Sequence, residues 1–180
     1  MTFRLNLDPQ LPEEKAPLIR RLRELWTRAA QVTRELQSPP AMHVRRTTTQ
    51  ALTAATPAKI QFNSTRYDTH GYWDATNYRY LPLRTGYYLF AWSLGFEAGA
   101  SANANCVAGL YIDGSADRAA NAINPTTTTQ ITASNSTIVY CNGSSRYLEV
   151  YGLCSQNTNV VGDQTYSYFV AHYIGDDQLR

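Results

Sequence analysis

The stretch GYYLFAWSLGF, residues 86–96, decides the fold class of this 180-residue chain. Successive residues of a β-strand point to opposite faces, and here both faces are apolar. Phe90 and Trp92 lie on one face, and Tyr87, Leu89 and Ala91 lie on the other, where a surface strand would carry Thr, Lys or Glu. The pattern predicts a strand with a core on one side and a contact between subunits on the other.

Further strands are predicted before and after this stretch, separated by turns rich in Gly, Asn, Asp and Ser. No helical period interrupts them, so the alternation of strands and helices found in α/β proteins is missing. From residue 58 onward the chain is therefore predicted to be all-β, an antiparallel jelly-roll sandwich. Its expected strands are residues 58–63, 77–82, 87–96, 106–113, 136–141, 146–154 and 165–174.

The composition changes near residue 46. Residues 1–46 carry a net charge of +4 and the remainder carries −2, while all 13 tyrosines follow residue 66. The overall charge of +2, without a long Lys/Arg cluster, does not indicate a nucleic-acid partner. No apolar run reaches the ~18 residues of a membrane span, and the first ten residues lack the apolar run of a secretory signal. We expect a protein made in the cytoplasm, with no membrane insertion.

The basic part of the chain predicts a helix over residues 12–37, or from Pro17 if that proline delays its start. Its apolar residues recur at intervals of four and three, as in a coiled-coil heptad. Ile19 and Trp26 widen this stripe, which favours a bundle of three or more helices over two. The predicted trimer stalk consists of Leu18, Leu22, Leu25, Ala29, Val32 and Leu36.

A helix with this apolar stripe needs a partner, because an isolated one would expose the stripe to water. We favour self-association over the alternative, in which the helix packs as a clasp along its own β domain. The predicted organisation is an anchor peptide at 1–11, the helical stalk at 12–37, a linker at 38–57 with a first edge strand near 47–52, and a jelly-roll head at 58–180.

Several short motifs in residues 47–175 resemble those of a known family. Asn63, the pair Tyr67-Asp68, and Pro82 followed by the strand that begins at Gly86 are similar to the motifs of the complement C1q-like domains. The segments LYIDG at 110–114 and SYFVAHY at 167–173 resemble their middle and last strands, with Asp for the usual Asn and Ala for the usual Gly. The likeness covers roughly residues 47–175.

The C1q-like resemblance implies a ten-stranded jelly roll, shared with the tumour necrosis factor ligands. It also implies a tight threefold trimer formed through an aromatic sheet face. Both apolar surfaces noted above would then be contacts between subunits. The residues expected in the head core and trimer face are Tyr78, Tyr80, Tyr87, Tyr88, Phe90, Trp92, Tyr151, Tyr168 and Phe169.

The front of the chain resembles a second group of proteins. Residues 7–12, LDPQLP, and 17–26, PLIRRLRELW, are similar to the N-terminal segment of small structural proteins of tailed bacteriophages. The resemblance implies a virion protein, a homotrimeric fibre or appendage that is attached to other virion proteins through its N-terminal segment and displays its head for host-surface binding. Alternatives are a capsid decoration protein without a receptor, a bacterial adhesin and a glycan hydrolase.

Nothing in the sequence predicts catalysis. Asp68 and Asp74 come nearest to the carboxylate pair of a glycan-cleaving enzyme, but Asp beside Gly in a turn usually caps the backbone. His43, His70 and His172 lack metal-ligand spacing, and no nucleophile elbow or phosphate loop occurs. We expect a protein that is not an enzyme, with no catalytic residue, no metal and no cofactor.

Members of the resembled family sometimes hold a calcium ion near the trimer axis. Asp113, Asp117, Asp163 and the tail pair Asp176-Asp177 are the acids available. A calcium ion needs about six oxygen ligands, and no clustered acidic run supplies them. Solvated loop acids are the favoured interpretation.

The three cysteines are Cys106, Cys141 and Cys154. They cannot all pair within one chain, and no Cys-x-x-Cys spacing is present. We expect three reduced, buried thiols, as in a protein assembled in the cytoplasm.

Long polar loops form the remaining candidate binding surface. Residues 121–136 and 155–164 are uncharged or nearly so and rich in Asn, Thr and Ser, and the His70–Trp73 loop adds aromatic side chains. Such loops contact glycans or proteins, although ordinary solvated loops look the same. The candidate receptor-binding residues, for a host-surface glycan or protein, are Tyr72, Trp73, Asn124, Thr128, Asn157 and Asn159.

Overall fold

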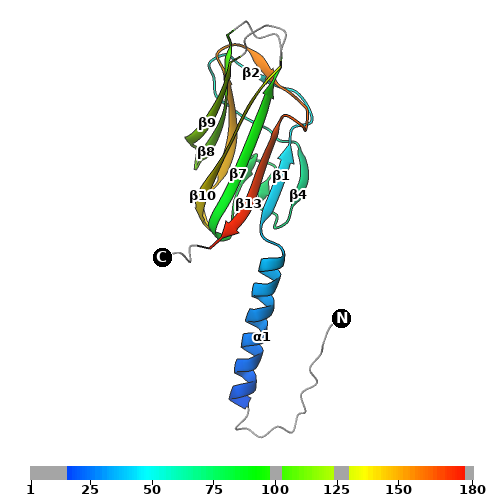
Figure 1. Cartoon of the computed structure of the whole chain (residues 1–180), viewed down its shortest axis with the longest axis vertical. Coiled ribbons are helices and arrows are strands. Elements are labelled where there is room, and N and C mark those ends of the chain that lie inside the picture. Colours follow the sequence, from blue (N-terminus) through cyan, green and yellow to red (C-terminus); the bar gives the residue numbers. More distant parts are fainter. Residues whose placement is uncertain (1–15, 98–102, 124–129, 177–180) are drawn as a thin grey trace. The chain divides into compact units, whose positions relative to one another are not determined.

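The computed structural model describes residues 16–97, 103–123 and 130–176 (Figure 1). The chain divides into two compact units, Met1–Ser38 and Pro39–Arg180. The first unit contains helix α1, Ala16–Gln37, which begins beside Pro17, close to the later of the two expected starts. In the part of the chain that the structure describes, no helix has the length and apolar character needed to cross a membrane.

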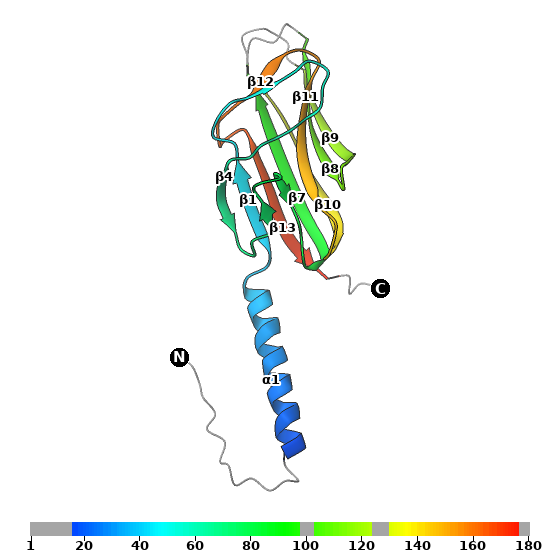
Figure 2. The same cartoon turned by 180° about the vertical axis from the view of Figure 1, so that it is seen from behind.

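The second unit, which we call the head, consists of two antiparallel sheets (Figures 1 and 2). The large sheet has the order β2-β12-β7-β13-β1-β4, and β10 also pairs with β7. Its strands are β1 (Ala41–Arg45), β2 (Gln50–Leu52), β4 (Ser64–Asp68), β7 (Thr85–Phe96), β10 (Ile131–Asn142), β12 (Thr158–Val160) and β13 (Tyr168–Gly175).

The small sheet has the order β5-β6-β11-β8-β9, with β3 also paired to β11. Its strands are β3 (Ala58–Lys59), β5 (Trp73–Asp74), β6 (Arg79–Tyr80), β8 (Asn105–Ile112), β9 (Ser115–Ile123) and β11 (Leu148–Cys154). The predicted all-β sandwich is confirmed.

The hydrophobic core lies between the two sheets. Alternate residues of β7 point into it, because a strand directs every second side chain to the same face. From the small sheet, the carbonyl of Ala108 accepts a hydrogen bond of 3.0 Å from the Trp92 indole. Each fully buried aromatic or aliphatic side chain contributes roughly 1.5–3 kcal/mol. The β7 residues buried in this core are Tyr88, Phe90, Trp92, Leu94 and Phe96.

The segment expected to be a linker, residues 38–57, contains an interior strand. β1 lies between β13 and β4, with Ala41 opposite His172 and Arg45 opposite Tyr168. Inward residues Met42 and Val44 are completely buried, although this short strand follows two prolines and carries polar residues on its other side. β2 falls within the edge strand expected near 47–52 and lies at an end of the large sheet.

Strands β4, β5, β9 and β12 were not predicted either. β9 has the sequence SADRAANAI, whose small and polar residues lack β-propensity, and it forms because β8 pairs with it along its whole length. Asn135 of β10 donates a 3.1 Å hydrogen bond to the carbonyl of Ala119, which ties β9 to the large sheet. Strand pairing therefore occupies part of the stretch 121–136 that was expected to be a loop.

The expectation of three reduced thiols is wrong. Cys106 and Cys154 form a disulfide, and Cys141 remains a buried free thiol. The two bonded cysteines are 48 residues apart in sequence, but the antiparallel register of β8 and β11 places them directly opposite each other, with their Cα atoms 4.1 Å apart. Only this register brings them together, and sequence spacing gives no sign of it.

Gly86, at the start of the β7 stretch, is required by its surroundings. Its φ of +140° is one that residues with a side chain rarely adopt. A Cβ at this position would lie 2.5 Å from the carbonyl oxygen of Gly175 and 2.7 Å from the Tyr173 ring. The glycine thus allows the ends of β7 and β13 to meet.

Candidate functional site

The candidate site is the side of the large sheet that points away from the core, which we call the outer face. Figure 1 shows its strands β10, β7, β13, β1 and β4 side by side. The alternation that buries Phe90 and Trp92 necessarily turns their neighbours outward. The outer face includes Tyr87, Leu89, Ala91 and Ser93 of β7, Ser134, Ser136, Ile138 and Tyr140 of β10, Tyr168, Val170, His172 and Ile174 of β13, His43 of β1 and Tyr67 of β4.

Aliphatic side chains occupy the middle of the outer face. Leu89 pairs with Ile138 on one side and with His172 on the other. Leu89 and Ile138 are 40% and 59% exposed, and Ile174 is 53% exposed. Two exposed aliphatic side chains that pair across neighbouring strands, with a third near the end of β13, are unusual for a monomeric surface and typical of an interaction site.

Aromatic residues extend the face at one end. Tyr87 and Tyr140 are cross-strand partners whose ring centroids lie 5.4 Å apart at an angle of 62°. Toward the other end of β7 the face becomes polar, because Ser93 and Ser134 lie opposite each other there. The Ser134 hydroxyl donates a hydrogen bond of 2.8 Å to the Ser93 hydroxyl. The apolar part of the outer face is therefore bounded along the strands.

His43 lies in the row of residues that runs Ser136, Ala91, Val170, His43, Tyr67 across the outer face. Its ring lies edge-on between two tyrosines, with centroids 5.7 Å from Tyr67 and 5.9 Å from Tyr168. Its Nε2 is buried and has no hydrogen-bond partner among the described residues. Burial, reinforced by the positive charges of Arg66 and Arg45, lowers the pKa of this imidazole below its ordinary 6.5.

The residues expected in the head core and trimer face separate into distinct groups. Tyr87 and Tyr168 lie on the outer face, and Tyr151 lies on the outward side of the small sheet. Tyr78 lies in the turn before β6, with a φ of +52°. The remaining residues of this list are buried in the core: Tyr80, Tyr88, Phe90, Trp92 and Phe169.

The candidate receptor-binding residues that the structure describes all take part in contacts within the head. Tyr72 packs on Tyr80 with centroids 6.0 Å apart, and Trp73 packs on Phe62 at 6.3 Å. Asn157 accepts a hydrogen bond from the amide of Ala54, and Asn159 donates one to Glu97, each 2.8 Å long. Asn124 and Thr128 lie outside the described residues.

Asp68 and Asp74 cap backbone amides, as turn aspartates usually do. Asp68 accepts hydrogen bonds from the amides of Tyr72 and Trp73 at 3.2 and 2.8 Å. Asp74 accepts from the amide of Asn77 at 3.0 Å and from the side chain of Arg79 at 3.1 Å. Hydrogen bonds from the Asn77 side chain and amide are the main cause of the lowered pKa of the Asp74 carboxyl.

The loop acids Asp113, Asp117 and Asp163, considered above as calcium ligands, each have another partner in the head. Asp113 pairs with Arg146 at 3.3 Å, and Asp163 accepts a hydrogen bond from the amide of Thr165 at 2.7 Å. Asp117 lies 3.8 Å from Arg118. Across residues 16–97, 103–123 and 130–176, no group of three or more His, Cys, Asp or Glu side chains is placed to hold a metal ion.

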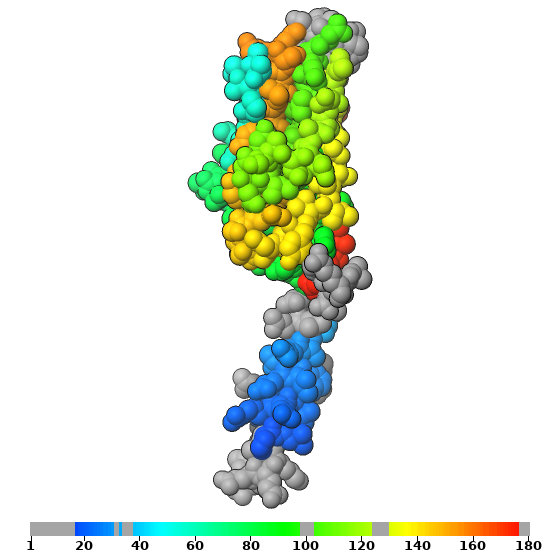
Figure 3. All heavy atoms as spheres, turned by 90° about the vertical axis from the view of Figure 1, so that its left-hand side faces the viewer, coloured from blue at the N-terminus to red at the C-terminus, as the bar shows by residue number. Residues whose placement is uncertain are grey.

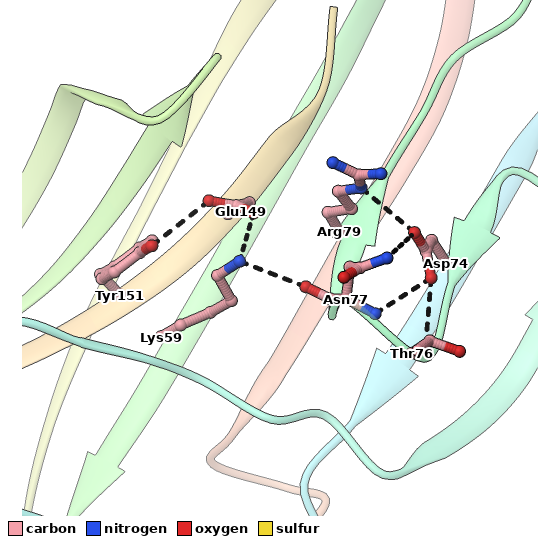
Figure 4. Close-up of polar contacts among 7 residues, drawn as sticks. All are labelled: Lys59, Asp74, Thr76, Asn77, Arg79, Glu149 and Tyr151. Atoms are coloured by element: carbon pink, nitrogen blue, oxygen red, sulfur yellow. Dashed lines mark hydrogen bonds and ion pairs between the residues drawn. The ribbon is translucent and has the colours of Figure 1, made fainter.

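A polar cluster lies on the outward side of the small sheet (Figure 4). Figure 3 views the head from this side. Glu149 is only 3% exposed, and its Oε1 lies 2.5 Å from Lys59 Nζ. Lys59 also donates to the carbonyl of Asn77 at 3.3 Å, while the Tyr151 hydroxyl lies 3.4 Å from Glu149 Oε2. The ion pair supplies the counter-charge that a buried carboxylate requires.

Next to this cluster is a hollow of about 210 Å³. Tyr111 and Tyr151 stack with their centroids 4.0 Å apart and form one wall. Gly109 and Leu153 line its apolar part, and Arg118 is among its polar residues. The hollow is smaller than the ≈ 300–1,000 Å³ usual for small-molecule sites.

The predicted stalk residues lie on α1. Leu18, Leu22 and Leu25 are largely exposed in the single chain, as is the neighbouring Trp26. Ala29 is exposed as well, while the side chains of Val32 and Leu36 lie outside the described part of the structure. The anchor peptide at residues 1–11 also lies outside it.

Comparison with known proteins identifies the fold of the head. The chain is similar to the globular domain of a zebrafish complement 1qA protein, with a TM-score of 0.56 and 12% identity over 77% of this chain and 99% of that one. It is also similar to murine APRIL (TM-score 0.57, 8% identity, 75% and 98% covered) and to Eiger TNF from S. frugiperda (0.55, 11%, 77% and 96%). No protein-family model and no curated protein matches the chain significantly.

At these identities the likeness concerns the fold. The head is a jelly roll of the type found in complement C1q and tumour necrosis factor domains, as the sequence resemblance implied.

Proposed function

We propose that this chain is the subunit of a homotrimer whose heads associate through the outer face. The exposed aliphatic cluster of Leu89, Ile138 and Ile174 carries this proposal. Removing apolar surface from water contributes roughly 25 cal/mol per Å², so covering this cluster with a second copy of the chain is favourable. The C1q-like domains that the sequence resembles form trimers through an aromatic sheet face, and the Tyr87–Tyr140 pair supplies such residues here.

The helix supports the same proposal independently. Leu18, Leu22 and Leu25 repeat at heptad spacing and are exposed in one chain. With Ile19 and Trp26 beside them, the apolar stripe is wide enough for three helices. Two units of one chain that each present an unpartnered apolar surface are consistent with the same threefold assembly.

The finer part of the proposal concerns where the trimer works. We infer a non-enzymatic structural protein of a tailed-phage virion, a fibre or appendage that is attached through its N-terminal segment and displays the head to a host-surface glycan or protein. This part rests on the sequence resemblance of residues 7–12 and 17–26 to phage structural proteins. The backbone-capping roles of Asp68 and Asp74 support the proposal that these two acids are not a catalytic pair.

A capsid decoration protein is the second candidate, because the described members of the receptor-binding set, such as Trp73 and Asn159, are engaged inside the head. Light scattering on the purified full chain tests the trimer, with an expected mass about three times 20.2 kDa. Fluorescent full-length chain incubated with susceptible and resistant cells then distinguishes the two roles. Selective binding supports a fibre, and equal, negligible binding supports decoration.

A further inference from the structure

Of the chain's three histidines, His43 is the one enclosed by its neighbours. His70 and His172 are exposed. His43 lies in β1 with its Nε2 buried, and Tyr67 of β4 and Tyr168 of β13 enclose its ring. The neutral imidazole is the favoured form here, because burying a nitrogen without a hydrogen-bond partner costs less free energy than burying a positive charge.

The charges around His43 all oppose its protonation. Arg45 on the same strand and Arg66 on β4 are the charged groups that act on it, and both are positive. From β13, the neighbouring titratable group on the outer face is His172. The nearest carboxylate along β4 is Asp68, whose two oxygens accept the amide hydrogens of Tyr72 and Trp73. Among the described residues, no acidic group acts on this imidazole to compensate a positive charge.

We propose that His43 is an acid-sensitive latch of the trimer: its neutral form permits the outer faces to associate, and its protonation drives the subunits apart. This inference rests on the proposed trimer. A second copy on the outer face removes more water from His43, so that a proton there becomes more costly in the assembly than in the free subunit. Acid therefore favours the separated subunits.

The direction of the pH effect follows from linkage. Burial already lowers the pKa of His43 below its ordinary 6.5 in the free subunit, and contact with a second copy lowers it further. Its contribution to the stability of the trimer is therefore complete above the pKa of the free subunit, and it is lost as the pH falls through that value toward the still lower pKa in the trimer. If all three copies take up a proton on separation, the trimer dissociation constant rises by up to about a thousandfold per pH unit in this window.

The experiment measures the mass of the full chain by light scattering between pH 7.5 and 5.0, for the wild type, H43Q and H70Q. The wild type and H70Q are expected to be trimers at pH 7.5 and to dissociate on acidification, whereas H43Q stays trimeric throughout. H70Q is the control because His70 is exposed and does not belong to the outer face. H43F, which keeps an aromatic ring, serves as a second variant without a titratable group.

Each result has one reading. A wild-type monomer at pH 7.5 overturns the proposed trimer itself. A wild-type trimer that persists at pH 5.0, or an H43Q or H43F trimer that dissociates in the same window, overturns the latch while leaving the trimer intact. If neither variant assembles, NMR titrations of His43 in the wild-type trimer and in separated I138D subunits decide: a pKa no lower in the trimer than in the separated subunits overturns the proposal, and a lower one supports it.

Discussion

Leu89 of β7 and Ile138 of β10 lie directly opposite each other in the antiparallel register of the large sheet, and both side chains point away from the core. They are 40% and 59% exposed, although each is flanked along its strand by core residues such as Phe90 and Val139. A polar pair would satisfy the strand geometry equally well. The pair is therefore best explained by a contact outside the single chain.

The first prediction is that I138D separates the subunits. An aspartate in the contact would have to be buried without a partner, so we expect the trimer to weaken at least ~100-fold, or roughly 3 kcal/mol. Sedimentation of the variant at micromolar concentration measures this. L83D is the control, because Leu83 is equally exposed but lies in the loop before β7. Trimers of I138D as tight as those of L83D would contradict the assignment of the outer face.

The second prediction concerns the disulfide. Alkylation of the denatured, unreduced chain should modify one thiol per chain, that of Cys141, and two more after reduction. Closing a loop of 48 residues contributes about 4 kcal/mol by restricting the unfolded chain, so the C106A/C154A variant should unfold at much lower urea. C141A tests whether loss of any buried cysteine has this effect. Three reactive thiols in the unreduced chain would show that the bond does not form.

The third prediction separates two buried tyrosine hydroxyls. Tyr80 Oη is buried without a hydrogen-bond partner among the described residues, whereas Tyr88 donates to the carbonyl of Arg84 at 2.9 Å. Y80F should leave the free energy of unfolding unchanged or raise it by about 1 kcal/mol, and Y88F should lower it by a similar amount. Urea denaturation compares them. Equal destabilisation by both variants would mean that Tyr80 has a partner, such as bound water.

The fourth prediction concerns the head alone. A chain that starts at Pro39 keeps every strand of the head and should give a β-rich circular dichroism spectrum with cooperative melting. A chain that starts at Thr47 loses β1, which lies between β13 and β4, and with it the buried Met42 and Val44. It should be aggregated or molten. Equal stability of the two truncated chains would show that β1 is dispensable.

The all-β class was predictable because the alternation of side chains within a single strand is visible in a short stretch of sequence. The alternation in residues 86–96 fixes which side chains of β7 face inward, and the structure places Phe90 and Trp92 accordingly. Tyr87 and Leu89 were likewise recognisable as residues of a second apolar face. What local sequence lacks is the identity of their neighbours, because Ile138 lies opposite Leu89 only through a pairing of strands about fifty residues apart.

The disulfide, β1 and His43 were not predictable for the same reason. Cys106 and Cys154 meet through the register of β8 and β11, and His43 is enclosed by residues of two other strands. The loop residues show the opposite failure. Trp73 and Asn159 are residue types that often form binding surfaces. In the structure, however, Trp73 packs against Phe62 and Asn159 donates a hydrogen bond to Glu97, so both contact other residues of the head.

The most direct test of the account is the accessibility of the outer face in the full chain. The rate of thiol labelling is measured at position 138 in I138C, in the background C141A, with L83C as the exposed reference. Ile138 is 59% and Leu83 58% exposed in the single chain, so the two rates should be similar if the chain is a monomer. The account predicts that I138C labels much more slowly at micromolar concentration and reaches the rate of L83C when dilution separates the subunits. Equal rates at every concentration would contradict it.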